Sequence, residues 1–255
     1  MNALKQYNAF GTESQTGSIP VVEMGSQSVQ IAIEGFNPKE ALDRYVYEVT
    51  IGNRPHHIFC YSYPSLGIDE LEENYTNSLA QEAGTATIKS PCYPEGATLQ
   101  FDYLDVTGTP NDANSYETCS ADLRKYSLLR FNSCKTDFCS FEGIPLPYDL
   151  STRGGTWWSH HQSVHALSVY TYASQEFLGK DAGYDNRTIQ ETEEFARELC
   201  SMDWNKLKET YPSASENYLK KYCLQMTASH IWLRDGLGLK ETDTVTRIWK
   251  VSVEE

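Results

Sequence analysis

The sequence predicts a single mixed α/β domain in which strands come first and helices follow. Residues 19–34 have the pattern of a strand, a tight polar turn and a second strand, with strict apolar and polar alternation from Val29 to Glu34. Residues 44–51 and 57–63 have similar β-rich patterns, so we expect a three-stranded antiparallel meander extended by further strands and flanked by helices. No repeat or low-complexity linker divides residues 1–255, which favours one domain.

The remaining elements follow in chain order. Asp69 is expected to begin a helix, because Glu72 three residues later completes a capping-box pattern. Residues 92–118 are rich in Gly, Pro, Asn and Asp and predict a loop region. Apolar spacing predicts three later helices and a closing strand, over residues 163–178, 188–209, 215–234 and 245–251.

The turn Gly25-Ser26-Gln27-Ser28 joins the first two predicted strands. Its small residues allow adjacent backbone N–H groups to converge and form an anion-binding nest, so the turn is a candidate phosphate cradle. An ordinary hairpin turn has the same composition, and the turn alone does not distinguish the two.

Composition excludes some classes of function. The net charge of −14 argues against binding nucleic acid through a basic surface, and no run of about 18 apolar residues is long enough to cross a membrane. A polyphosphate ligand would need a nest of amides or a divalent cation to offset this charge. Two histidine groups, His56-His57 and His160-His161 with His165, lack the spacing of a zinc site and are interpreted as solvated polar residues. Trp157-Trp158 is interpreted as a cap on a hydrophobic edge.

The seven cysteines predict three disulfides and one free thiol, Cys60. Their positions favour the pairs Cys92–Cys119, Cys134–Cys139 and Cys200–Cys223, because no cysteine or histidine spacing suits zinc. Disulfides predict an oxidising compartment, and sequons at Asn74 and Asn186 agree with it as candidate glycosylation sites. Residues 1–7 lack the apolar core of a signal peptide, so we expect the natural N-terminus to lie upstream.

Several segments together resemble the apyrases, the ectonucleoside triphosphate diphosphohydrolases. Residues 22–31 are similar to that family's second phosphate loop, and residues 134–144 to its C-x4-C-S-F-x-G stretch. The other similar segments, in the same order as in the family, are residues 57–71, 166–172, 222–238 and 247–249. The resemblance implies a ribonuclease-H-like lobe related to actin and the sugar kinases.

The resemblance covers the second lobe only. The first lobe's phosphate loop and its water-activating glutamate have no counterpart in the sequence, so residues 1–255 are expected to equal the C-terminal lobe, with the N-terminal lobe absent. Residues 239–255 are expected to form a closing segment that packs on the missing lobe. The chain alone is therefore expected to be inactive.

The resemblance also implies roles around the first turn. Gly25, Ser26 and Gln27 would hold phosphate through backbone amides, while Ser28 and Gln30 would orient the attacking water. Ser26 replaces the family's second glycine, and its side chain is expected to crowd the phosphate.

Three further residues complete the implied site. Glu23 stands where the family has an aspartate that holds the water shell of a divalent cation, calcium or magnesium, although a strand carboxylate can also simply face solvent. Tyr172 would stack on the base, with Tyr170 as the other candidate, and packing is the ordinary role of both. Trp249 would lie near the metal's water shell or in the core.

The implied function is hydrolysis of nucleoside tri- and diphosphates with release of phosphate. The alternative is a degenerate, non-catalytic nucleotide-binding or interaction module, which the departures at Ser26, Val29 and Tyr218 favour. The expected partners are a nucleotide and the missing lobe, with no nucleic acid and a membrane contacted only through absent segments. The expected location is extracellular or in the secretory-pathway lumen.

Overall fold

The computed structural model describes residues 19–34, 44–51, 53–128, 139–146, 163–178 and 182–249. Several sequence features lie outside the described residues, namely residues 1–7, Cys134, Trp157-Trp158 and His160-His161.

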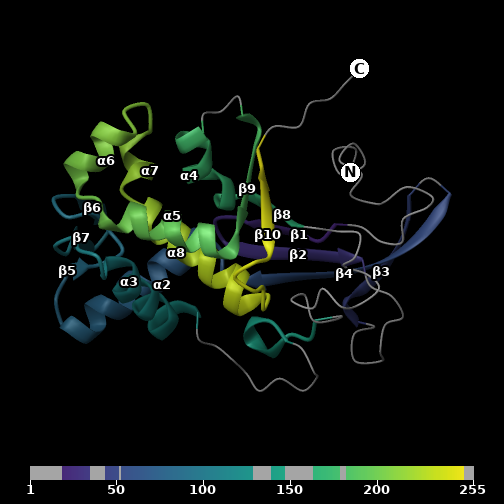
Figure 1. Ribbon diagram of the computed structural model, residues 1–255. Helices are drawn as coiled ribbons and strands as arrows, with labels where there is room; N and C mark the ends of the chain where they lie inside the picture. The colour runs from purple at the N-terminus through teal and green to yellow at the C-terminus, as the bar shows by residue number, and fades with distance from the viewer. Residues whose placement is uncertain are drawn as a thin grey trace.

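A seven-stranded sheet forms the centre of the fold, in the order β3-β4-β2-β1-β8-β10-β9 (Figure 1). Its strands are β1 (Val21–Met24), β2 (Ser28–Glu34), β3 (Val46–Ile51), β4 (Arg54–Pro64), β8 (Ser163–Ser168), β9 (Tyr184–Thr188) and β10 (Thr244–Ile248). Strands β1, β8 and β10 run parallel, and the other pairings in the sheet are antiparallel. The predicted mixed α/β class is thus confirmed.

The opening antiparallel strands are confirmed, but their order differs from a simple meander. Strand β2 pairs with β4, and β3 lies outside β4 at the edge of the sheet. Phe59 and Tyr63 of β4 are fully buried and lie opposite Ile33 and Val29 of β2, so this pairing joins two apolar faces. The side chains of residues 46–50 on β3 are partly or largely exposed, which suits an edge strand.

Helices gather on one side of the large sheet in Figure 1, and a three-stranded sheet lies beyond them. The helices are α2 (Ile68–Ala83), α3 (Ser115–Leu123), α4 (Val169–Leu178), α5 (Ile189–Ser201), α6 (Trp204–Thr210), α7 (Glu216–Leu219) and α8 (Tyr222–Ile231), with short turns η2 (Arg124–Leu128), η3 (Phe141–Gly143) and η5 (Trp232–Gly236). The small sheet has the order β5-β7-β6, from β5 (Thr87–Ser90), β6 (Thr98–Phe101) and β7 (Leu104–Gly108). None of the helices in the described ranges is long and apolar enough to span a membrane.

The core lies between the large sheet and α8 with η5. Every residue of α8 is buried. Trp232 at the start of η5 is fully buried, with its ring 5.0 Å from that of Tyr63 on β4 and 5.3 Å from that of Phe141. This contact fixes α8 against the strands that carry the phosphate-loop candidate.

Four predicted elements need correction. Residues 92–118 contain the β6–β7 hairpin as well as loops, because Leu99, Leu104 and Val106 bury one face of it. The predicted helix 163–178 begins as a strand: β8 lies between β1 and β10, and its period-2 pattern is short because a parallel strand is covered on both faces. The helices predicted over 188–209 and 215–234 are each divided into shorter helices, and Asp203 caps α6 by accepting the Lys206 N–H at 2.8 Å.

Two of the predicted disulfides are confirmed, Cys92–Cys119 and Cys200–Cys223. Cys60 is a free, partly buried thiol, as expected. Cys139 is disulfide-bonded, while its predicted partner Cys134 lies outside the described residues.

Candidate functional site

The turn after β1 is held against the N-terminus of α2 by its carbonyl groups. The Gly25 and Ser26 carbonyls accept the N–H groups of Ile68 and Asp69, both at 2.9 Å, and the Gln27 carbonyl accepts the Ser65 N–H at 3.0 Å. These bonds satisfy N–H groups that the first turn of a helix leaves unpaired. The loop and the helix are therefore one structural unit.

This arrangement directs the loop amides away from α2. In a trans peptide the N–H points opposite to the preceding C=O, so the N–H groups of Ser26 and Gln27 face outward. Both residues are exposed, and within the described ranges neither N–H has a hydrogen-bond acceptor. Two adjacent outward amides form the kind of nest that binds an anion.

Gly67, just before α2, lets the loop approach the helix closely. A Cβ atom at this position would lie 2.2 Å from the Ser28 nitrogen and 2.4 Å from the Gln27 carbonyl carbon. Only glycine fits there without displacing the loop. The resemblance covered Gly67 without giving it a role, and a lone glycine before a helix offers no signal of such contact.

Ser26, which replaces the family's second glycine, has an ordinary backbone conformation. Its φ is not positive, because the positive values outside glycine in the described residues belong to Ser65, Glu142 and Ser168. A side chain at Ser26 therefore strains no left-handed backbone, and the side chain is exposed.

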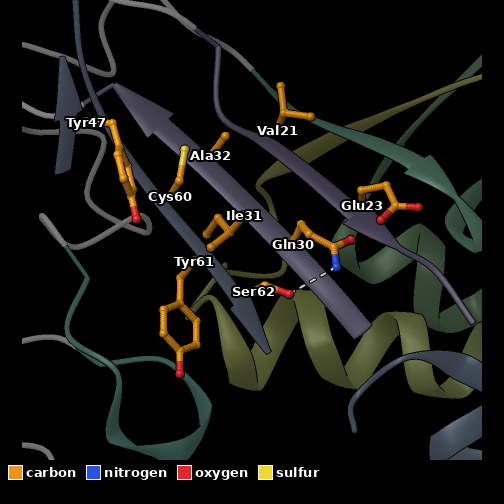
Figure 2. A pocket seen from close by; sticks show the side chains of 9 residues that line it. All are labelled: Val21, Glu23, Gln30, Ile31, Ala32, Tyr47, Cys60, Tyr61 and Ser62. Atoms are coloured by element: carbon orange, nitrogen blue, oxygen red, sulfur yellow. Dashed lines mark hydrogen bonds between the residues drawn. The ribbon is translucent and has the colours of Figure 1, made fainter. Parts of the chain in front are cut away.

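A row of polar side chains crosses three strands beside the loop. Glu23 on β1 lies opposite Gln30 on β2, which lies opposite Ser62 on β4. The Gln30 amide donates to Ser62 Oγ at 3.2 Å (Figure 2). It also donates to Ser28 Oγ. The structure thus brings Ser28 and Gln30 together and adds Ser62, which sequence reasoning had covered without a role.

The row forms one end of a groove of about 440 Å³ on this face of the sheet. Figure 2 shows Glu23, Gln30 and Ser62 beside Val21, Ala32 and Cys60, the next row along the strands. The other lining residues are Ile31, Tyr47 and Tyr61. The groove therefore has a polar end next to the loop and an apolar remainder.

Glu23 is the acidic residue of this groove. Both its carboxylate oxygens lie within 3.7 Å of the position that a Cβ on Gly25 would occupy, so the carboxylate is beside the loop. Among the described residues nothing forms a salt bridge with it, and no group of three or more His, Cys, Asp or Glu residues could cage a metal ion. A single carboxylate with nearby hydroxyl and amide oxygens suits a magnesium ion that is bound mainly to a ligand phosphate. Such an ion keeps several waters, and these waters can bind the protein oxygens.

Tyr172 and Tyr170 on α4 are separated by their burial. Tyr170 is fully buried, and burial raises the pKa of its hydroxyl, so it has no free face for a base. Tyr172 is 38% exposed, and its ring centroid lies 6.4 Å from that of Tyr218, tilted by 55°. Burial raises the pKa of the Tyr172 hydroxyl, and Tyr218, Glu23 and Asp69 raise it further.

Trp249 follows β10 at the same end of the strands as the loop, because β1, β8 and β10 run parallel. Strand β8 separates β10 from β1, so Trp249 lies two strands away, at about 10 Å by ordinary strand spacing. It is partly buried, and its backbone N–H donates to the Gly183 carbonyl at 3.1 Å. The Trp249 backbone therefore lies two strands from the loop, and its role near a metal's water shell stays a prediction.

The histidines were only partly anticipated. His56 is buried and its Nδ1 lies 2.7 Å from a Glu34 carboxylate oxygen, and His165 is buried in β8, so the solvated interpretation is wrong for both. His57 is half exposed and lies 3.5 Å from Glu48. Asn74 and Asn186, the sequon residues, are both exposed.

Comparison with known proteins finds relatives among the apyrases and nucleoside triphosphate diphosphohydrolases. The chain is 24% identical over 235 residues to a probable apyrase 5 of Arabidopsis thaliana, covering 88% of this chain and 46% of that protein. It is 21% identical to ectonucleoside triphosphate diphosphohydrolase 1 of Rattus norvegicus, covering 86% and 43%, and 24% identical to a Golgi apyrase of Schizosaccharomyces pombe, covering 91% and 40%. The chain thus spans less than half the length of these relatives.

The fold is also found among solved structures. A nucleoside triphosphate hydrolase from Neospora caninum superposes with a TM-score of 0.56 at 12% identity, covering 98% of this chain and 58% of that one. This similarity confirms the predicted fold. The model of the GDA1/CD39 (nucleoside phosphatase) family matches residues 3–255, and the chain belongs to that family.

Proposed function

We propose that this chain binds a nucleoside tri- or diphosphate together with a divalent cation, as the second lobe of a nucleoside phosphatase. The observation that carries the proposal is the loop geometry: the carbonyls of Gly25, Ser26 and Gln27 are all engaged by the α2 segment. The outward amides of Ser26 and Gln27 then hold the terminal phosphate beside Glu23.

The polar row serves the attacking water. Phosphoryl transfer depends mainly on positioning and on neutralising charge. Gln30 donates to the hydroxyl oxygens of Ser28 and Ser62, which leaves the Ser28 hydroxyl hydrogen available to a water or a phosphate oxygen. Glu23 would hold the water shell of a bound calcium or magnesium ion, which supplies charge neutralisation at the phosphates.

Tyr172 and Tyr218 form the base end of the site. Two exposed rings 6.4 Å apart offer their faces to a planar base, and stacking tolerates different bases. Where the family offers an arginine shortly before Cys223, this chain has Tyr218 and Lys220, so an aromatic ring would stand in for a guanidinium on one side of the base. Either group can stack on a base.

The lobe needs a partner for catalysis. Of the nine residues that line the groove, Glu23 is the one carboxylate, and its role is at the metal. A first lobe would supply the water-activating glutamate. Residues 239–255 were expected to pack on that lobe, but β10 within them is an inner strand of this chain's own sheet, paired with β8 and β9. The chain alone would bind nucleotide without turnover.

The non-catalytic alternative draws on Ser26, Val29 and Tyr218. Val29 is fully buried on the core face, opposite to the groove, so it removes no group from the proposed site. The exposed Ser26 has an ordinary backbone, and Tyr218 pairs with Tyr172. These positions do not exclude nucleotide binding.

The disulfides and the exposed sequon asparagines support a location in the secretory pathway or outside the cell. Family names among the relatives, including the Golgi apyrase, agree with this proposal.

Calorimetric titration of the 255-residue chain with ATP in magnesium or calcium tests the proposal. We expect metal-dependent binding that weakens by about 1 kcal/mol or more in Tyr172→Ala through lost stacking. Tyr103→Ala is the matched control, because Tyr103 is 81% exposed in the β6–β7 turn. Absence of ATP binding, or an equal loss in both variants, would contradict the proposal.

A further inference from the structure

Glu72 has a buried carboxylate that the proposed site does not use. The sequence pattern predicted a capping box with Asp69, but the residue before α2 is Gly67 and no side chain caps the helix. The Glu72 side chain is instead 5% exposed and points inward. Its Oε1 accepts the Tyr93 hydroxyl at 2.9 Å and its Oε2 accepts Lys221 Nζ at 2.5 Å. Both oxygens are thus paired, as a buried carboxylate requires.

One end of this ion pair is fixed to the phosphate loop. Glu72 lies in the early part of α2, whose first N–H groups donate to the Gly25 and Ser26 carbonyls. A shift of α2 along its axis would therefore move the loop amides with it.

The other end is fixed to the aromatic pair. Lys221 follows α7, which contains Tyr218, and the Lys221 N–H donates to the Tyr218 carbonyl at 2.8 Å. The Tyr218 ring in turn lies next to that of Tyr172. The Glu72–Lys221 pair thus connects the two ends of the proposed nucleotide site through contiguous bonds.

Both residues that bind the Glu72 carboxylate, Tyr93 and Lys221, lie close to disulfide-bonded cysteines. Tyr93 follows Cys92, which is bonded to Cys119, and Lys221 lies two residues before Cys223, which is bonded to Cys200. Tyr93 is fully buried, and burial together with the charge of Glu72 keeps its pKa well above the ordinary value, so its hydroxyl remains a donor.

We propose that the Glu72–Lys221 ion pair sets the distance between the phosphate loop and the Tyr172–Tyr218 pair, so that the site selects ligands in which a base and a polyphosphate are separated as in a nucleotide. This inference rests on the proposed function. Glu72 and Lys221 are positioning residues, since neither is placed to touch the ligand.

The test compares a whole nucleotide with its two halves. ATP, adenosine and tripolyphosphate are titrated with magnesium into the wild-type chain and into Glu72→Gln/Lys221→Met, which removes the pair without leaving a buried charge. We expect ATP affinity to fall about tenfold in the double variant, a typical coupling between sites, while each half binds within about twofold of wild type.

Lys220→Met is the matched control. Lys220 is adjacent in sequence, but its Nζ donates to the Thr98 carbonyl of β6 at 3.1 Å and not to α2. It should leave the binding of all three ligands unchanged. Lys221→Arg keeps the ion pair and should retain most of the ATP affinity. Should the double variant fail to fold, Glu72→Gln alone removes the charge of the ion pair at nearly constant side-chain size and should give the same ligand pattern.

Three outcomes overturn the inference. ATP affinity that is unchanged in the double variant would show that spacing does not depend on the pair. An equal loss for ATP and tripolyphosphate would show local damage to the loop. A wild-type chain that binds none of the three ligands would refute the proposed function itself.

Discussion

Replacing Gly67 with alanine tests whether the loop and α2 act as one unit. The new Cβ would lie 2.2 Å from the Ser28 nitrogen, whereas ordinary contact begins at 3.4 Å, so the loop must move by about 1.2 Å. The loop–helix hydrogen bonds from Ile68 and Asp69 measure 2.9 Å, and such a shift would stretch them beyond about 3.2 Å, the usual limit.

Two measurable effects follow from this displacement. Overpacking and the lost bonds should lower the free energy of unfolding by about 1–3 kcal/mol, measured by urea titration. Because an error of about 1 Å in a positioning group can cost up to 100-fold in function, tripolyphosphate affinity should fall at least tenfold, measured by calorimetry with magnesium.

Gly84→Ala at the other end of α2 is the matched control. Gly84 has φ +65° with nothing within 4 Å of its added Cβ, so alanine there costs about 1 kcal/mol of stability through backbone strain alone. Its tripolyphosphate affinity should equal that of wild type. The reasoning is refuted if Gly67→Ala binds tripolyphosphate as tightly as Gly84→Ala does.

Two further predictions concern turnover and acid stability. The chain alone should release no appreciable phosphate from ATP with calcium or magnesium; robust turnover that Ser28→Ala abolishes would contradict this. Burial, reinforced by nearby arginines such as Arg234, lowers the pKa of His230 from 6.5 to about 3 although Glu193 lies 3.6 Å away, so the folded state binds fewer protons than the unfolded state below pH 6.5. The neutral His230 therefore costs no stability well above pH 6.5. As the pH falls, the free energy of unfolding decreases, by about 2 kcal/mol at pH 5 relative to neutral pH. His230→Gln should therefore lose less stability between pH 6.5 and 5 than wild type in urea titrations, and equal losses would show that His230 does not contribute.

The opening strands and the turn were predictable because their signal is local. Alternation in β2 marks its buried face directly, and Gly25 to Ser28 mark the turn. Strand β8 was harder to predict, since it lies between two parallel neighbours and its alternation runs only from Ser163 to Ala166 before Leu167 breaks it. Its pairing partners are distant in sequence, and the following helix α4 extended the helical pattern backward over it.

Side-chain roles were harder to predict than elements. Tyr170 and Tyr172 are both tyrosines, two positions apart on one helix, so the local sequence does not distinguish them. The packing of α4 against the core buries Tyr170 and leaves Tyr172 partly exposed. Glu72 matched a local capping pattern, yet its partners Tyr93 and Lys221 lie 21 and 149 residues away. A tertiary ion pair of this kind leaves no trace in local spacing.

Two departures from the family pattern, Ser26 and Val29, matter less for catalysis than the number of carboxylates in the groove. Val29 faces the core and Ser26 has an ordinary backbone, so neither removes the phosphate nest. The groove, however, offers one carboxylate, Glu23, for two tasks. A carboxylate that holds a metal's water shell is not free to accept a proton from the attacking water. It is therefore a poor base for the attacking water, and a second carboxylate from outside this groove would have to take that proton.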